Sequence, residues 1–304
     1  MAVAVFLGAV CDAGRMELIM KVIISFALLV LIALSIAVSA QRPEEMTRKL
    51  WDTAFSDSSA KKTTTRRRVY RNATPNVPVN NVAPETVVGV TLWRLRRPTR
   101  TDSGERLIVH DENATTEWVP ERISAITKLG QGDRLRISVE AVRAGYVYIV
   151  DREQYADGSL GEPYLIFPTN RTGGGDNHVA IGRLLDIPAQ DDSPPFFTMK
   201  KSRPDHVAEV MSVIVTPTKL DGVKITDKAL KLSDEQVASW EKEWGSNVGR
   251  MEMAMAGQPW TKEEKDARTR ALTASAPPPQ LVFYRPSVKP TEPMFVKLRL
   301  AYGR

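Results

Sequence analysis

Histidines and carboxylates are the side chains of this sequence with the widest chemical range, and their spacing limits what they can do. His110, His178 and His206 are far apart and form neither an HxH nor an HExxH pair, the spacings typical of metal centres. The polar cluster at residues 110–112 is a weak zinc candidate, and the acidic stretch 151–158 lacks the ligand pattern of a calcium loop. We therefore predict no metal site and no cofactor, with each histidine at the surface or at a strand end.

Nucleophilic catalysis requires a serine, threonine or cysteine that is activated by a nearby base. Ser159 lies in a DGSLG turn without the GxSxG spacing of a nucleophile elbow. The glycine-rich segment 169–177 lacks the Gly-Lys-Ser/Thr that completes a phosphate-binding loop. No catalytic residue is therefore predicted. One enzymatic alternative stays open, a hydrolase that uses the loop carboxylates Asp151, Asp157 and Asp176.

Four residues near the middle of the chain are candidates for ligand binding. Tyr146 and Tyr148 share one face of a predicted strand, Tyr164 lies on a neighbouring strand, and Asp151 follows the first strand. Exposed tyrosines would form an aromatic platform for a glycan or a peptide, whereas buried ones would be ordinary core residues. The core alternative is favoured, because strands use aromatic residues mainly for packing.

These candidates belong to residues 133–168, which carry the clearest strand pattern of the sequence. Apolar and polar residues alternate over 134–140, and β-branched and aromatic residues fill 146–150 and 164–167. Turn signals separate the three segments, at Gly145 and at Gly158. The pattern predicts an antiparallel meander of three consecutive strands.

The remaining pattern predicts a mainly-β fold, an antiparallel β-sandwich that is immunoglobulin-like or similar. Further strands are expected over residues 86–95, 107–109, 196–199, 206–215, 281–284 and 294–302. Two helices are expected between the strands at 206–215 and 281–284. One runs from Ser233 to Trp244 and the other from Thr261 to about Ala274, each with N-capping residues. The predicted units are a sandwich at 85–218, a helical insertion at 219–280 and C-terminal strands at 281–304 that pack back on the sandwich.

The N-terminal region predicts export. Lys21 precedes an uncharged apolar run, residues 22–38, that leads to a Val-Ser-Ala site ending at Ala40. We expect residues 1–40 to hold a signal peptide cleaved after Ala40, with the true start at Met20, and a periplasmic or extracellular product. Contact with a membrane is expected only through this segment, if it stays uncleaved. The only cysteine, Cys11, lies within it, so the mature chain is expected to have no disulfide.

Residues 41–84 have the composition of a flexible basic linker, in a chain whose net charge is +6. Its positive charge is concentrated in Lys61, Lys62, Arg66, Arg67 and Arg68. A solvated linker is the favoured interpretation, and nucleic acid is disfavoured as a partner because no aromatic residues are interleaved to stack on bases. The alternative is a tether to a polyanion or to the envelope surface.

The order of motifs in the central region resembles a bacterial domain family of unknown function, DUF4384. The motifs are LGQGDRLRISV at 129–139, GYVYIVD at 145–151, Asp-Gly at 157–158 and LIFP at 165–168. The resemblance covers about residues 126–218. It implies a domain found in bacterial exported proteins, without agreed catalytic residues. The sequence thus predicts an exported, non-enzymatic cell-envelope module that binds an envelope protein, a peptide or a glycan.

Overall fold

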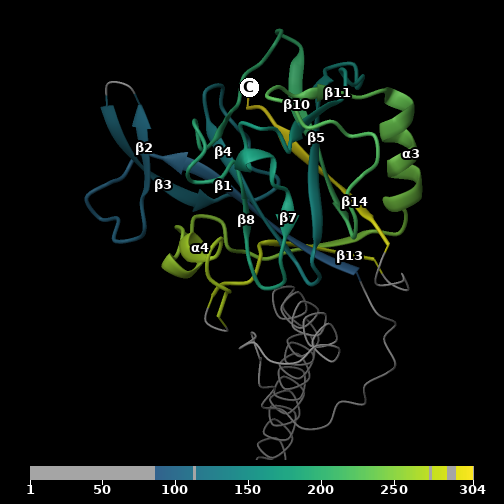
Figure 1. Ribbon diagram of the computed structural model, residues 1–304. Coiled ribbons are helices and arrows are strands. Elements are labelled where there is room, and N and C mark those ends of the chain that lie inside the picture. Colours follow the sequence, from purple (N-terminus) through teal and green to yellow (C-terminus); the bar gives the residue numbers. More distant parts are fainter. Residues whose placement is uncertain (1–85, 112–113, 274–275, 286–291, 304) are drawn as a thin grey trace, which may run out of the picture. The chain divides into compact units, whose positions relative to one another are not determined.

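A computed structural model of the chain describes residues 86–111, 114–273, 276–285 and 292–303. The predicted signal segment and the basic run from Lys61 to Arg68 lie outside the described residues. Within the described ranges, no helix is both long enough and apolar enough to cross a membrane. Figure 1 shows the described residues as two sheets with short helices at their margins.

Eight of the described strands form the first sheet, which is organised around its longest strand, β1 (Thr86–Arg96). One edge of β1 pairs first with β13 and then with β3, while β4 pairs along the other edge. Every strand pairing in this sheet is antiparallel. The other members are β2 (Leu107–Asp111), β3 (Ala114–Arg122), β4 (Arg134–Ala141), β8 (Leu185–Ile187), β9 (Phe197–Thr198), β12 (Gly249–Glu252) and β13 (Leu281–Arg285).

Six described strands form the second sheet, in the order β11-β6-β5-β10-β14, with β7 also paired to β5. These pairings are antiparallel as well. The C-terminal strands are divided between the sheets, because β13 joins the first and β14 the second. The strands are β5 (Gly145–Tyr155), β6 (Tyr164–Phe167), β7 (His178–Val179), β10 (His206–Thr216), β11 (Leu230–Lys231) and β14 (Met294–Ala301).

The hydrophobic core lies between the two sheets and follows from alternation along their strands. In the first sheet, Val90 of β1 and Ile137 of β4 are fully buried on the inner face. In the second sheet, Ile149 of β5, Val213 of β10 and Val296 of β14 lie side by side in register and face the same core. The predicted mainly-β, antiparallel sandwich is confirmed.

Two α-helices occur in the described residues, both between β10 and β13, as the sequence predicts. Ser233 caps α3 (Asp234–Trp244) by accepting a hydrogen bond from the Gln236 N–H at 3.1 Å. Val237 of this helix packs against the outer face of the second sheet, where Phe295 is also buried. The predicted helical insertion also contributes strands, because β11 pairs with β6 and β12 pairs with β13. A short 3-10 turn, η1 (Gly173–Gly175), completes the elements.

The second helix is shorter than predicted. The capping box of Thr261 and Glu264 is present, but α4 spans only Lys262–Asp266. Beyond it, the backbone pairs with residues 182–184 instead of continuing as helix: Leu184 N–H donates to Ala267 O, and Leu272 N–H donates to Gly182 O. The burial of Ala267 and Leu272 against Leu184 offsets the helical hydrogen bonds that are lost.

The predicted three-strand meander is wrong at its first turn. Strand β5 pairs with β6 as expected, but β4 belongs to the first sheet and does not pair with β5. Both strands are apolar enough on their inner faces to be covered by another sheet, so the chain crosses from one sheet to the other between them. A local alternation pattern is equally consistent with a hairpin and with such a crossing.

Gly145, where the chain enters the second sheet, lies against the neighbouring strand. A methyl group at this position would lie 2.5 Å from the carbonyl oxygen of Thr216, which belongs to the paired backbone of β10. We expect Gly145→Ala to lower the free energy of unfolding by about 1–3 kcal/mol, because the strands must separate locally. Chemical denaturation measures this. Gly130→Ala is the matched control, since its methyl group would meet only an ordinary 3.7 Å contact. Equal stability of the two variants would contradict the close approach.

Candidate functional site

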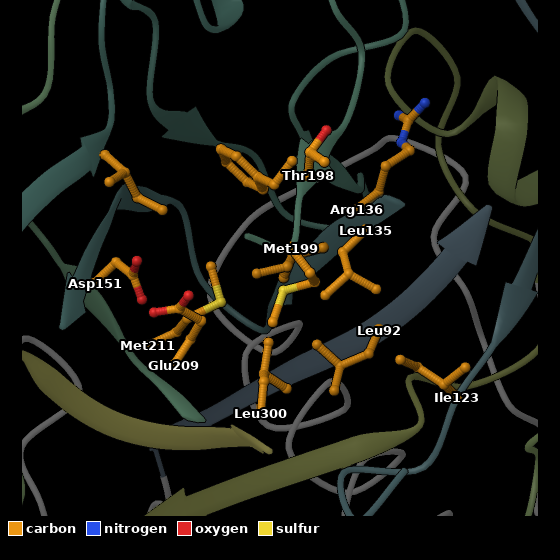
Figure 2. A pocket seen from close by; sticks show the side chains of 13 residues that line it. Leu92, Ile123, Leu135, Arg136, Asp151, Thr198, Met199, Glu209, Met211 and Leu300 are labelled. Atoms are coloured by element: carbon orange, nitrogen blue, oxygen red, sulfur yellow. The ribbon is translucent and has the colours of Figure 1, made fainter. Parts of the chain in front are cut away.

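A cavity of about 170 Å³ lies between the two sheets. The first sheet contributes Leu92 and Leu135 to its wall, and the second contributes Met211 and Leu300 (Figure 2). Most of the lining is apolar, but two carboxylic acids, Asp151 and Glu209, also line it. The rest of the wall is formed by Ile123, Arg136, Ile137, Ile166, Phe197, Thr198 and Met199.

The register of β5 and β10 explains why acids face the core here. Ile149 lies opposite Val213, then Asp151 lies opposite Met211, and two residues further on Glu209 pairs with a second glutamate, Glu153. Alternation keeps all of these side chains on the inner face of the second sheet. The inner face therefore changes from apolar to acidic toward one end of the sandwich, and the cavity lies at this change.

The carboxyl groups of Asp151 and Glu209 face each other across the pairing of β5 with β10 (Figure 2). One oxygen of each, Asp151 Oδ1 and Glu209 Oε2, is sealed from solvent and has no hydrogen-bond partner among the described residues. Glu209 Oε1 accepts a hydrogen bond from the Tyr302 hydroxyl at 2.9 Å. Buried oxygens without a hydrogen-bond partner cost free energy, so a ligand group that donates hydrogen bonds to them would bind favourably.

Burial and mutual repulsion set the protonation of the pair. Burial, followed by the negative charge of Glu209, raises the pKa of Asp151 to about 8. Burial also raises the pKa of Glu209, but the hydrogen bond from Tyr302 opposes this shift. Near neutral pH, Asp151 is therefore protonated, which relieves its repulsion with the neighbouring acid.

His206, at the start of β10, supports the acids from outside the cavity. Its ring is fully buried, Nδ1 accepts from the Ser202 N–H at 3.3 Å, and Nε2 donates to the carbonyl of Ala208 at 2.9 Å. The ring also lies close to two acids, with Nε2 3.3 Å from Glu209 Oε1 and Nδ1 3.8 Å from Glu153 Oε1. The ring lies edge-on to Tyr302, with 4.9 Å between centroids, and so fixes the phenol that holds Glu209.

The cavity offers hydrogen-bonding groups on one wall and mostly apolar surface elsewhere. Thr198 carries the only hydroxyl group among the lining residues, and it is exposed at the rim. In the part of the chain that the structure describes, no three histidine, cysteine or acidic residues come together as metal ligands. Two acids with unpartnered oxygens in mostly apolar surroundings favour a ligand that brings a hydrogen-bond donor or a positive charge.

The four predicted binding residues do not come together. Tyr148 is buried on the outer face of the second sheet, and its hydroxyl accepts from the Leu220 N–H at 2.9 Å. Tyr146 is half-buried on the same face, edge-on to His178, whereas Tyr164 is exposed. Asp151 points into the core from the opposite face of β5. An exposed tyrosine platform does not form, because the segment before α3 covers Tyr148.

The loop carboxylates of the hydrolase alternative are also separate. Asp157 Oδ1 accepts from the backbone and the hydroxyl of Ser159, and Asp176 Oδ1 accepts from the His178 N–H. Each therefore stabilises its own turn, and neither lines the cavity with Asp151. The remaining histidine, His110, is exposed on β2 and contacts the Thr115 hydroxyl at 3.1 Å.

Sequence reasoning missed the partners of Asp151. Glu209 interrupts an otherwise apolar inner stripe, Val207 to Val215, and a charged residue at such a position was the available signal. Tyr302 carried no such signal, because its contact with Glu209 depends on the pairing of β10 with β14, which are far apart in the sequence.

Comparison with known proteins adds no relative: no family model, no curated protein and no solved structure matches this chain.

Proposed function

We propose that this chain is a non-catalytic binding module of the cell envelope, whose interior cavity binds a small ammonium-bearing molecule. The observation that carries the proposal is the pair of unpartnered acid oxygens, on Asp151 and Glu209, at one wall of a mostly apolar cavity. Both oxygens are hydrogen-bond acceptors, and one ammonium group has enough N–H donors to bond to both. Buried charge is tolerated in proteins when it is paired and hydrogen-bonded in this way.

The cavity limits the size of the ligand. An engineered apolar cavity of roughly 150 Å³ accommodates one benzene ring, and the volume here, about 170 Å³, is similar. A single ring or a short alkyl chain with an amino group therefore fits, whereas a glycan chain or a peptide does not. Met199 and Met211 line the apolar part, and their flexible thioethers adapt to different hydrocarbon shapes.

Benzylamine and benzyl alcohol provide a matched pair of probes, equal in shape and different in charge. Isothermal titration at pH 7 is expected to give at least a tenfold higher affinity for benzylamine, because a charge-assisted hydrogen bond contributes about 1.5–3 kcal/mol. The Asp151→Asn, Glu209→Gln double variant is expected to lose this preference. Asp221→Asn, which removes an exposed carboxylate outside the cavity, is expected to keep it.

Two results would contradict the proposal. One is equal affinity of the full chain for the amine and the alcohol. The other is amine binding that survives the double variant unchanged while circular dichroism shows the variant to be folded.

A further inference from the structure

The outer face of the first sheet carries a ladder of arginine and tryptophan side chains. Strand register places Trp93 of β1 between Arg122 of β3 and Arg136 of β4. The Arg122 guanidinium carbon lies 4.9 Å from the centre of the Trp93 ring, and that of Arg136 lies 5.3 Å from the Trp260 ring. Two residues further along β1, the same face reaches the end of this strand, which we call the open end of the sheet.

At the buried end of this ladder, each guanidinium has a carboxylate. Arg122 is paired with Glu264, and Arg136 lies 3.2 Å from Asp186, with all four side chains almost completely buried. This is the expected behaviour of buried arginines, because an uncompensated charge in the interior is costly.

The half-buried arginines of β1 are neutralised too. Arg96 lies 2.7 Å from Asp102 and 2.5 Å from Glu121, and Arg94 lies 3.7 Å from Glu121. Carboxylates therefore accompany the arginines of this sheet both at its buried end and on the strand that leads to the open end.

The open end is different. Arg97 and Arg134 contact the same indole, that of Trp118, with guanidinium carbons 4.2 and 4.1 Å from the ring centre. Arg134 also lies 4.6 Å from the ring of Phe196. In the described parts of the chain, neither guanidinium has a carboxylate within ion-pair distance. Burial, and then the charge of Arg97, lowers the pKa of Arg134, which is consistent with two like charges held close together.

We propose that Arg97, Trp118 and Arg134 form an oxyanion clamp that binds a phosphate monoester. Two unneutralised positive charges match a group that carries about −1.5 to −2 at neutral pH, whereas a carboxylate would leave one charge unpaired. Both guanidinium carbons lie within 4.2 Å of the centre of one ring, so the two positive charges belong to one local site. Because the indole already stacks on the guanidiniums, their hydrogen-bonding edges are oriented before the ligand arrives.

This site lies on the outer face of the first sheet, whereas the amine cavity lies on its inner face, so the two proposals stand independently. The fixed arrangement of planar guanidiniums also distinguishes the clamp from a merely basic surface. Phosphate oxygens accept paired hydrogen bonds from the guanidinium fork, which a lysine ammonium cannot supply in the same geometry.

Titration of the full-length chain with inorganic phosphate tests the clamp. The protein is labelled with ¹⁵N at tryptophan, and the indole resonance of Trp118 is followed at constant ionic strength in sodium chloride. A saturable shift is expected with phosphate, at least fivefold weaker binding with acetate, and none with chloride. A Trp118 resonance that does not move with phosphate, or that moves equally with acetate, would overturn the proposal.

Three single variants locate the binding. Arg97→Gln removes an exposed guanidinium without disturbing the core and is expected to weaken phosphate binding at least tenfold, as is Arg134→Gln. Arg100→Gln removes the same charge from the neighbouring exposed turn and is expected to change the affinity less than twofold. Equal effects of Arg97→Gln and Arg100→Gln would reduce the site to general surface charge and refute the clamp. Thermal unfolding of each variant identifies any loss that comes from misfolding.

Discussion

Replacing Glu264 by alanine is expected to lower the free energy of unfolding by about 3–5 kcal/mol, because it leaves Arg122 buried without a counter-charge. Both side chains are almost completely buried, and the guanidinium lies between the Trp93 ring and the carboxylate. Glu264 also accepts from the backbone and the hydroxyl of Thr261, so the same change removes the capping box of α4. Urea denaturation of the variant and of the unchanged chain measures the loss.

Glu263→Ala is the matched control for this prediction. It removes the same side chain from the adjacent position of α4, but Glu263 is exposed, and we expect a change within about 0.5 kcal/mol. A double variant separates the loss of the ion pair from the cost of leaving Arg122 buried without a counter-charge. Arg122→Met combined with Glu264→Leu removes both charges and is expected to recover part of the stability. If Glu264→Ala costs no more than Glu263→Ala, the buried pair does not stabilise the fold.

Asp151→Asn is expected to remove the loss of stability that alkaline pH causes in the unchanged chain. The folded-state pKa of Asp151 is raised to about 8, so the folded chain binds more protons than the unfolded chain between about pH 4 and pH 8. Stability from this group is therefore complete below the unfolded pKa and is lost as the pH rises through 8. At pH 9 the neutral amide is expected to make the variant more stable than the unchanged chain, by about 2 kcal/mol.

Thermal unfolding at pH 5, 7 and 9 tests this expectation. At pH 5 the acid in the folded chain is neutral, as is its amide replacement, so the difference between the two chains is expected to be smaller than at pH 9. Asp221→Asn, at an exposed position, serves as the control and is expected to follow the unchanged chain at every pH. A constant difference between Asp151→Asn and the unchanged chain across the three pH values would show that Asp151 does not titrate in this range.

Much of the architecture follows from local sequence, because alternation and capping are local properties. The strand over residues 206–215 and the Ser233 cap of α3 are both where the sequence predicts them. Pairing partners are not local. The alternation of β4 fits a hairpin with β5, yet its hydrogen bonds go to β1, because covering two apolar faces requires two sheets.

The candidate site was predictable only in part. Asp151 was singled out because it follows an aromatic strand, and it does line the cavity, but together with Glu209 and not with tyrosines. A strand pattern assigns Tyr148 to a face without saying whether anything covers that face. Helix α3 and the segment before it decide this, and their docking depends on residues more than seventy positions further along the chain.

The pairing of β1 with β13 has a consequence for how the protein is made. Val88 lies opposite Phe283, so the longest strand of the first sheet finds one of its neighbours only when β13 has been synthesised. The second sheet likewise lacks β14, the neighbour of β10, until that strand has been synthesised. A nascent chain therefore has incomplete sheets until β13 and β14 have been synthesised, and contacts this distant in sequence make folding slow. Until then, the unpaired edges of β1 and β10 need protection from other chains.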